Sequence, residues 1–212
     1  MVVFTSVVPR RHNRNMSIKL NQSMSKTSRR IFLSLVTVSF CGLSDNLFGQ
    51  DNSSSPQNFK YLQEHLRTPR LIGKGNYTYW GFDVYYASLW ASESALKPLD
   101  WAEQRLALDL LYLRDFDGKD IAKRSIDEIS KQSPLYEDKA SAWLKTLERL
   151  FPNVHKGESL TGVFIPNLGA QFFFNGKPIG GINDLELAKR FFAIWLSPQT
   201  SAPDLRQKLF GD

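Results

Sequence analysis

The chain of 212 residues is poor in the side chains that bind metals or act as thiol nucleophiles. Its single cysteine is Cys41, so residues 51–212 can neither form a disulfide nor use a thiolate in catalysis. His65 and His155 stand alone, without carboxylates at the spacing of zinc ligands. The glycine-rich Gly73-Lys74-Gly75 lacks both the Ser or Thr after the lysine and the helix that a phosphate-binding loop requires. We therefore expect no metal and no cofactor.

An excess of basic residues is also missing from most of the chain. The formal net charge is +6, but residues 1–50 hold seven of the 27 Lys and Arg and only one of the 21 Asp and Glu. Subtraction leaves 20 basic and 20 acidic residues in 51–212, a net charge of zero. Neutralising the phosphates of a nucleic acid requires a clustered excess of Lys and Arg. We therefore expect no nucleic-acid partner.

The apolar run near the start of the chain is too short to cross a bilayer. It begins at Ile31 and ends near Phe40, whereas a spanning helix needs about 20 apolar residues. Arg29-Arg30 directly precede it, an arrangement that resembles a twin-arginine export signal, with an ordinary secretory signal as the alternative. We expect residues 1–50 to be an export leader and the polar residues 51–58 to be a disordered spacer. Residues 59–212 then form one domain, periplasmic or otherwise exported, with no stable membrane span after signal removal.

Residues 160–196 carry the strongest local structural signals of the sequence. Asn175-Gly176 lies between two apolar runs, a pattern typical of a hairpin whose type I′ turn needs positive φ at both central residues. Asn183 and Asp184 can cap the helix that follows. The apolar residues of that helix recur at helical spacing, and they are Leu185, Ala188, Phe191, Phe192 and Trp195. This block predicts a hairpin with a helix packed back on it.

The other elements predict an α+β fold, with a large, mostly antiparallel sheet and a layer of helices on one face. Residues 71–91 suit two strands that meet near Gly81, and residues 105–116 suit a central strand because both of its faces are largely apolar. Helical spacing predicts helices at 119–131, over the apolar positions of 140–151, and at 203–209. Large aromatic residues fall on both faces of the sheet. Either the second face is covered as well, or it lines an apolar cleft.

Four stretches together resemble the bacterial chalcone-isomerase-like proteins. They are GKGNYTYWGFDVYYASLWA at 73–91, LYLRDFDGKDIAKRSIDEI at 111–129, ERLFPNVHKGESLTGVFIP at 148–166, and the stretch FFFNGKPIGG to LFG at 172–211. The resemblance covers nearly all of the exported part. It implies the chalcone isomerase fold, in which a large antiparallel sheet and a layer of helices enclose a cleft for a flat apolar ligand.

The resemblance also implies where catalytic residues would fall. The plant enzymes of the family cyclise a chalcone with an arginine that holds a phenolate and a tyrosine and threonine that polarise the ketone. Here the tyrosine position falls on Ile121, the threonine position on Tyr86 and the arginine position on Lys74. Losing one such donor can cost about 3 kcal/mol of transition-state stabilisation. We therefore expect no efficient chalcone cyclisation and assign no catalytic residue.

Three functional hypotheses follow. In the first, the protein is non-catalytic and binds a small apolar or fatty-acid-like ligand, with Lys74 or Arg114 near its acidic end and Tyr86 and Tyr112 lining the cleft. In the second, it is an isomerase, an intramolecular lyase that acts on an enone. In the third, it is a structural or partner-binding domain whose cleft is filled by side chains. We favour the first.

Overall fold

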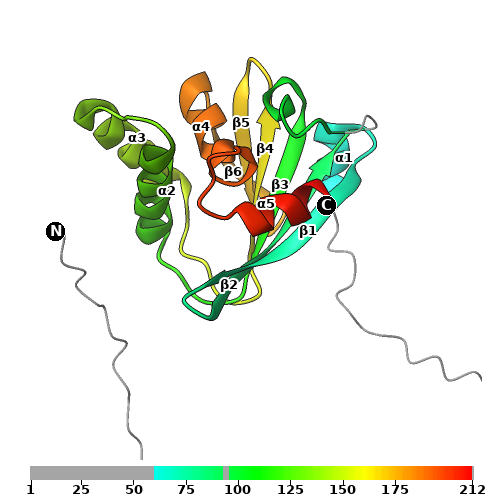
Figure 1. The fold of residues 1–212 in the computed structure, drawn as a ribbon, viewed down its shortest axis with the longest axis horizontal. Helices are drawn as coiled ribbons and strands as arrows, with labels where there is room; N and C mark the ends of the chain where they lie inside the picture. Colours follow the sequence, from blue (N-terminus) through cyan, green and yellow to red (C-terminus); the bar gives the residue numbers. More distant parts are fainter. Residues whose placement is uncertain (1–59, 93–95, 212) are drawn as a thin grey trace, which may run out of the picture. The chain divides into compact units, whose positions relative to one another are not determined.

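The computed structural model describes residues 60–92 and 96–211, so the predicted leader at 1–50 and spacer at 51–58 lie outside the described residues. A six-stranded antiparallel sheet, with its strands in chain order, organises this part of the chain (Figure 1). The strands are β1 Arg70–Tyr79, β2 Phe82–Ala91, β3 Leu106–Tyr112, β4 Ser159–Ile165, β5 Gly169–Phe174 and β6 Lys177–Ile182. The helices are α1 Lys60–Leu66, α2 Gly118–Gln132, α3 Glu137–Leu150, α4 Leu185–Leu196 and α5 Pro203–Phe210, with a 3₁₀ turn at Trp101–Glu103. The predicted α+β fold is confirmed.

Strand β3 lies inside the sheet between β2 and β4, as its two apolar faces predict. Leu106, Leu108, Leu110 and Tyr112 belong to the main core beneath α2–α5, whereas Ala107 belongs to a second core on the other face. Alternation along a strand sends successive side chains to opposite faces. The middle of the sheet is therefore packed on both sides.

The two faces of the sheet are covered unequally. Helices α2, α3, α4 and α5 form the predicted layer on one face (Figure 1), with α5 over β1 and β2 and α4 over β4 to β6. On the other face the short helix α1 packs Leu62 and Leu66 against Val163 and Phe173. Helix α1 thus covers part of the second face. Coverage of this face was one of the two alternatives that its large aromatic residues suggested.

The hairpin between β5 and β6 and the helix after it form as predicted. Asn175 and Gly176 have φ values of 49° and 77°, the positive angles that a type I′ turn requires. Helix α4 buries Phe191, Phe192 and Trp195 against the sheet. Leu185 is the exception to the predicted face, because its side chain is 50% exposed.

Helix α4 begins at a side-chain cap whose loss should be measurable. Asp184 accepts hydrogen bonds from the backbone N–H groups of Glu186 and Leu187, each at 3.0 Å, and from Trp143 Nε1 at 2.8 Å. We expect Asp184→Ala to lower the free energy of unfolding by about 1–2 kcal/mol, as measured by urea denaturation. Asn183→Ala, one residue earlier, is the matched control and should change it by less than about 0.5 kcal/mol. Equal effects would contradict the assignment of the cap to Asp184.

Glycine in β1 permits close contact between the sheet and helix α5. A Cβ atom placed on Gly73 would lie 2.2 Å from the carbonyl oxygen of Lys208. A side chain at this position would therefore push the helix off the strand. Gly73, which precedes Lys74, therefore allows helix α5 to pack closely on β1.

Candidate functional site

A cavity of about 380 Å³ lies between helix α2 and the strands β1 to β3, and it is partly open to solvent. Its wall is formed by Tyr77, Tyr79, Val84, Tyr85, Leu110, Tyr112, Phe116, Asp120, Ile121, Arg124, Ser125, Glu128, Leu160, Phe191, Ile194, Trp195, Ser201 and Ala202. The volume falls within the ~300–1,000 Å³ typical of small-molecule sites, and the wall combines many apolar side chains with a few polar ones.

The cavity exists because helix α2 packs on its neighbouring helices more than on the sheet. The apolar stripe of α2, formed by Ala122, Ile126 and Ile129, joins the core with α3 and α4. The side of α2 that faces the cavity carries Ile121 and Ser125. Space therefore remains over the strands opposite this side of the helix.

Two tyrosine hydroxyl groups in the cavity wall are available to donate hydrogen bonds. Tyr85 accepts a hydrogen bond from Trp195 Nε1 at 2.8 Å, which leaves its own O–H free to donate. Tyr112 is 4% exposed, and its hydroxyl makes no hydrogen bond to any described residue. Burial raises the pKa of both phenols well above the ordinary value. Both hydroxyls are therefore protonated at neutral pH, and that of Tyr112 has no side-chain partner among residues 60–92 and 96–211.

One ion pair lies at the edge of the cavity. Arg124 Nη2 lies 2.8 Å from Glu128 Oε1, and Glu128 also accepts from Ser201 Oγ at 2.6 Å and from Lys131 Nζ at 2.9 Å. Burial would raise the pKa of Glu128, but the hydrogen bonds from Ser201 and Lys131 and the charge of Arg124 outweigh it and lower the pKa. The carboxylate is thus ionised and fully paired, and Arg124 is the basic residue of the cavity wall.

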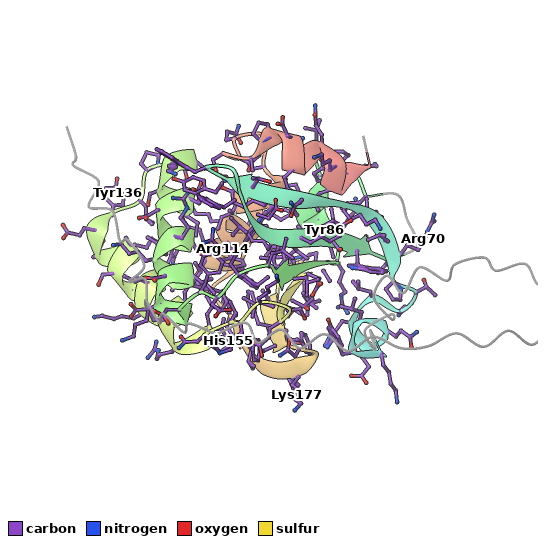
Figure 2. All side chains as sticks on the ribbon, turned by 90° about the horizontal axis from the view of Figure 1, so that it is seen from below. Arg70, Tyr86, Arg114, Tyr136, His155 and Lys177 are labelled. Atoms are coloured by element: carbon purple, nitrogen blue, oxygen red, sulfur yellow. The ribbon has the colours of Figure 1, made fainter. Side chains whose placement is uncertain are left out.

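The four residues that the sequence predicted to contact a ligand lie in different places. Tyr112 is part of the cavity wall. Lys74 and Tyr86 project from the other face of the sheet, because the strand pairs Gly75–Ala87 and Tyr77–Tyr85 face the helix layer. Arg114 also lies outside the wall, with its guanidinium 4.8 Å from the ring centre of Phe82. Figure 2 shows Tyr86 on the β1–β2 hairpin and Arg114 nearer to α2.

Comparison with known proteins decides the family. The sequence profile described as chalcone isomerase-like matches residues 56–211, most of the chain. The protein belongs to this chalcone isomerase-like family. It is also similar to an uncharacterized protein of Haemophilus influenzae, with 27% identity over 140 residues that span 66% of this chain and 67% of the relative.

A similar fold occurs among solved structures. The crystal structure of a fatty-acid binding protein of Arabidopsis thaliana matches with a TM-score of 0.51 and 11% identity, over 67% of this chain and 86% of that one. At this level of identity the likeness concerns the fold. It confirms the chalcone isomerase fold for this chain.

The residue that the family resemblance assigns to the plant tyrosine position lies in the cavity wall. Ile121, where the sequence comparison put that tyrosine, is part of the wall and carries no hydrogen-bond donor. No cluster of His, Cys, Asp and Glu suited to a metal ion occurs among residues 60–92 and 96–211. Within the same ranges, a search for helices with the length and apolar character of a membrane span finds none.

Tyr85 and Arg124 were not among the ligand-binding residues that the sequence predicted. Side chains alternate between the two faces of β2, and Tyr85 shares its face with the apolar residues Ala87, Leu89 and Ala91. This pattern could have identified Tyr85 as a residue of the helix-covered face. Arg124 is spaced to pair with Asp120 on a solvated helix face, but in the structure it pairs with Glu128 and lines the cavity. Its orientation depends on how α2 packs, which helical spacing alone does not define.

Proposed function

We propose that this chalcone isomerase-like protein is exported and binds, without catalysis, a small apolar or fatty-acid-like ligand in the cavity beneath α2. The observation that carries the proposal is the cavity itself, about 380 Å³ in volume and lined mainly by aromatic and aliphatic side chains. The proposal of export rests on Arg29-Arg30 and the short apolar run after them.

The walls of the cavity suit a ligand with one polar end. Leu110, Leu160 and Ile194 offer an apolar surface for a chain or a flat ring system. The free hydroxyl of Tyr112 and the donating O–H of Tyr85 supply hydrogen bonds to a carboxyl or carbonyl oxygen. The Arabidopsis protein of the same fold is named for fatty-acid binding, and this supports the ligand class.

The hydroxyl of Tyr112 gives the ligand its orientation in this proposal. A ligand oxygen that accepts a hydrogen bond from this hydroxyl gains about 0.5–1.5 kcal/mol and a defined direction. Lys74 and Arg114, which the sequence placed near the acidic end, lie outside the wall. Arg124 takes the place of the cation, at the edge of the cavity and already paired with Glu128.

Filling the cavity should abolish binding. Ile121 lines the cavity, whereas Ile179 on β6 is also half-buried but lies outside its wall. We expect the wild type to carry a co-purifying ligand in native mass spectrometry. We also expect its melting temperature to rise by about 5–10 °C with an acyl carboxylate at about 100 times Kd. Ile121→Trp should lose both effects while remaining folded, and Ile179→Trp should keep both.

The outcome separates the three hypotheses. No co-purifying ligand and no thermal shift over a panel of acyl chains would contradict ligand binding and favour a structural role. Cyclisation of a chalcone or a simpler enone faster than in buffer would favour the intramolecular lyase instead. We expect no such acceleration, because Ile121 cannot polarise a carbonyl group.

A further inference from the structure

The turn between β1 and β2 exposes a cluster of aromatic side chains, which we call the aromatic tip: Tyr79, Trp80 and Phe82. These side chains are 42%, 83% and 60% exposed, respectively. Tyr79 also belongs to the cavity wall, and its cross-strand partner is Phe82. The aromatic surface thus runs from Tyr77 and Tyr85 inside the cavity, through Tyr79, to the exposed tip.

Packing within the domain does not explain the tryptophan at this turn. Trp80 and Gly81 have φ values of 52° and 78°, nearly those of Asn175 and Gly176 in the other hairpin, 49° and 77°. Asn adopts positive φ readily, whereas a bulky residue does so at an energetic cost. The same turn therefore occurs twice, once with the favourable residue and once with an exposed tryptophan.

Basic side chains flank the aromatic tip. The guanidinium of Arg114 lies 4.8 Å from the ring centre of Phe82, and that of Arg124 lies 5.1 Å from the ring centre of Tyr79. Arg124 pairs with Glu128, but Arg114 forms no ion pair with any described residue. The N–H groups of Arg114 are therefore available to an anion such as a phosphate.

The acidic residues that follow Phe82 and Arg114 in sequence, Asp83 and Asp115, contact other residues. Asp83 accepts hydrogen bonds from the side chains of Asn76 and Thr78. Asp115 accepts from the backbone N–H of Lys156 at 2.8 Å and lies 3.6 Å from His155 Nδ1. Neither carboxylate neutralises Arg114 directly.

We propose that the aromatic tip docks on the surface of an anionic phospholipid bilayer. Trp and Tyr favour the interface between water and hydrocarbon, because their rings are apolar at one end and polar at the other. Arg114 meets a lipid phosphate, and Trp80 and Phe82 enter the headgroup region. The cavity wall adjoining Tyr79 then faces the bilayer, where a poorly soluble ligand is found. The transfer of a ligand between the bilayer and the cavity rests on the proposed function, whereas the docking itself does not.

The emission of Trp80 tests the docking in the full-length chain. Residues 1–50 contain no tryptophan, Trp101, Trp143 and Trp195 are buried, and Trp90 is half-buried, so vesicle-dependent changes report on Trp80. The probe is a vesicle of phosphatidylcholine with phosphatidylglycerol, brominated near the headgroup. We expect a blue shift and quenching in the wild type, and neither in Trp80→Asn, where Asn tolerates the positive φ.

A second variant keeps the reporter and weakens the docking. Phe82→Ser retains Trp80 and should lower the partition coefficient about tenfold, because it removes an aromatic side chain from the interface. Arg114→Ala should weaken binding to vesicles that contain phosphatidylglycerol more than binding to pure phosphatidylcholine. Tyr136→Ser is the matched control, since Tyr136 is 81% exposed and lies at the outer end of the helix layer (Figure 2). It should bind like the wild type.

Several outcomes would overturn the proposal. One is a Trp80 emission that vesicles of both compositions leave unchanged, and another is an equal loss of binding in Phe82→Ser and Tyr136→Ser. A dimer in sedimentation velocity that Phe82→Ser dissociates, without quenching by lipid, would assign the aromatic tip to a second copy of the chain. Octanoate binding measured without vesicles separates the two proposals: if it persists while docking fails, the proposed function stands and the docking is wrong.

Discussion

Phe192→Ala is expected to lower the free energy of unfolding by about 3–5 kcal/mol, the usual cost of removing a buried aromatic side chain. Phe192 is fully buried, and its ring centre lies 5.4 Å from that of Phe164 and 6.4 Å from that of Phe172. A Cβ atom on Gly162 would lie 2.9 Å from the tip of the Phe192 ring, so the ring rests directly on the backbone of β4. Removing it leaves a void that the rigid sheet cannot close.

Urea denaturation, followed by far-ultraviolet circular dichroism, measures the effect of this substitution. Leu185→Ala is the matched control on the same helix, because Leu185 is 50% exposed, and we expect a change of less than about 1 kcal/mol. The order of the two effects tests which side of α4 faces the sheet. A cost for Leu185→Ala equal to that of Phe192→Ala would contradict the packing of α4 described above.

As the pH rises from about 4 to about 7, ionisation of Asp109 is expected to lower the free energy of unfolding of the wild type by about 3 kcal/mol. In Asp109→Asn this decrease should be absent. Asp109 is 6% exposed in the middle of β3, on the face of the sheet that α1 covers. It accepts a hydrogen bond from Thr161 Oγ1 at 2.6 Å, and Thr161 in turn hydrogen-bonds with Tyr61 of α1 at 2.8 Å. Burial raises the pKa of Asp109 to about 6, although the hydrogen bonds from Thr161 and Ser159 oppose it.

The sign of the effect follows from proton linkage. The unfolded chain releases the proton of an aspartate near pH 3.9, whereas the folded protein holds that of Asp109 to about pH 6. Between these values the folded state binds more protons, so its stability falls as the pH rises. The difference of about two pKa units corresponds to about 3 kcal/mol.

Urea denaturation of the wild type and the variant at several pH values between 4 and 7.5 checks this prediction. The difference between the two proteins isolates Asp109 from the other carboxyl groups. We expect Asp109→Asn to gain stability relative to the wild type as the pH rises, because Asn stays neutral and its carbonyl oxygen still accepts from Thr161. Asp127→Asn, at an exposed position of α2, is the control. A constant difference across the pH range would show that Asp109 is ionised in both states.

Local signals in the sequence were sufficient for most of the secondary structure. Asn175-Gly176 defines its hairpin because the conformation depends on the φ preferences of two adjacent residues. Helices α2 and α3 follow from apolar residues at helical spacing, and β3 is central because both of its faces are apolar. The family resemblance predicted the overall fold, and the comparisons confirm it.

The residues at the cavity were harder to predict, because a shift of one residue moves a strand side chain to the opposite face. The sequence match selected Tyr86, whereas the register of β1 and β2 places Tyr85 in the cavity wall. Tyr112, which the sequence predicted to line a cleft, lies in the cavity wall and shares its face with Leu108 and Leu110. Its role in binding a ligand stays a prediction.

The sequence by itself determined the type and order of the strands and of helices α2 to α5, the α+β class and the helix that carries Phe191, Phe192 and Trp195, but it did not predict α1. These depend on interactions within a few residues and on the periodicity of apolar side chains. Only the tertiary structure decided that α2 packs on α3 and α4 and leaves a cavity above β1 to β3. It also placed Arg114 and Arg124 over the rings of the aromatic tip. These features depend on contacts between segments far apart in the chain, which local preference does not specify.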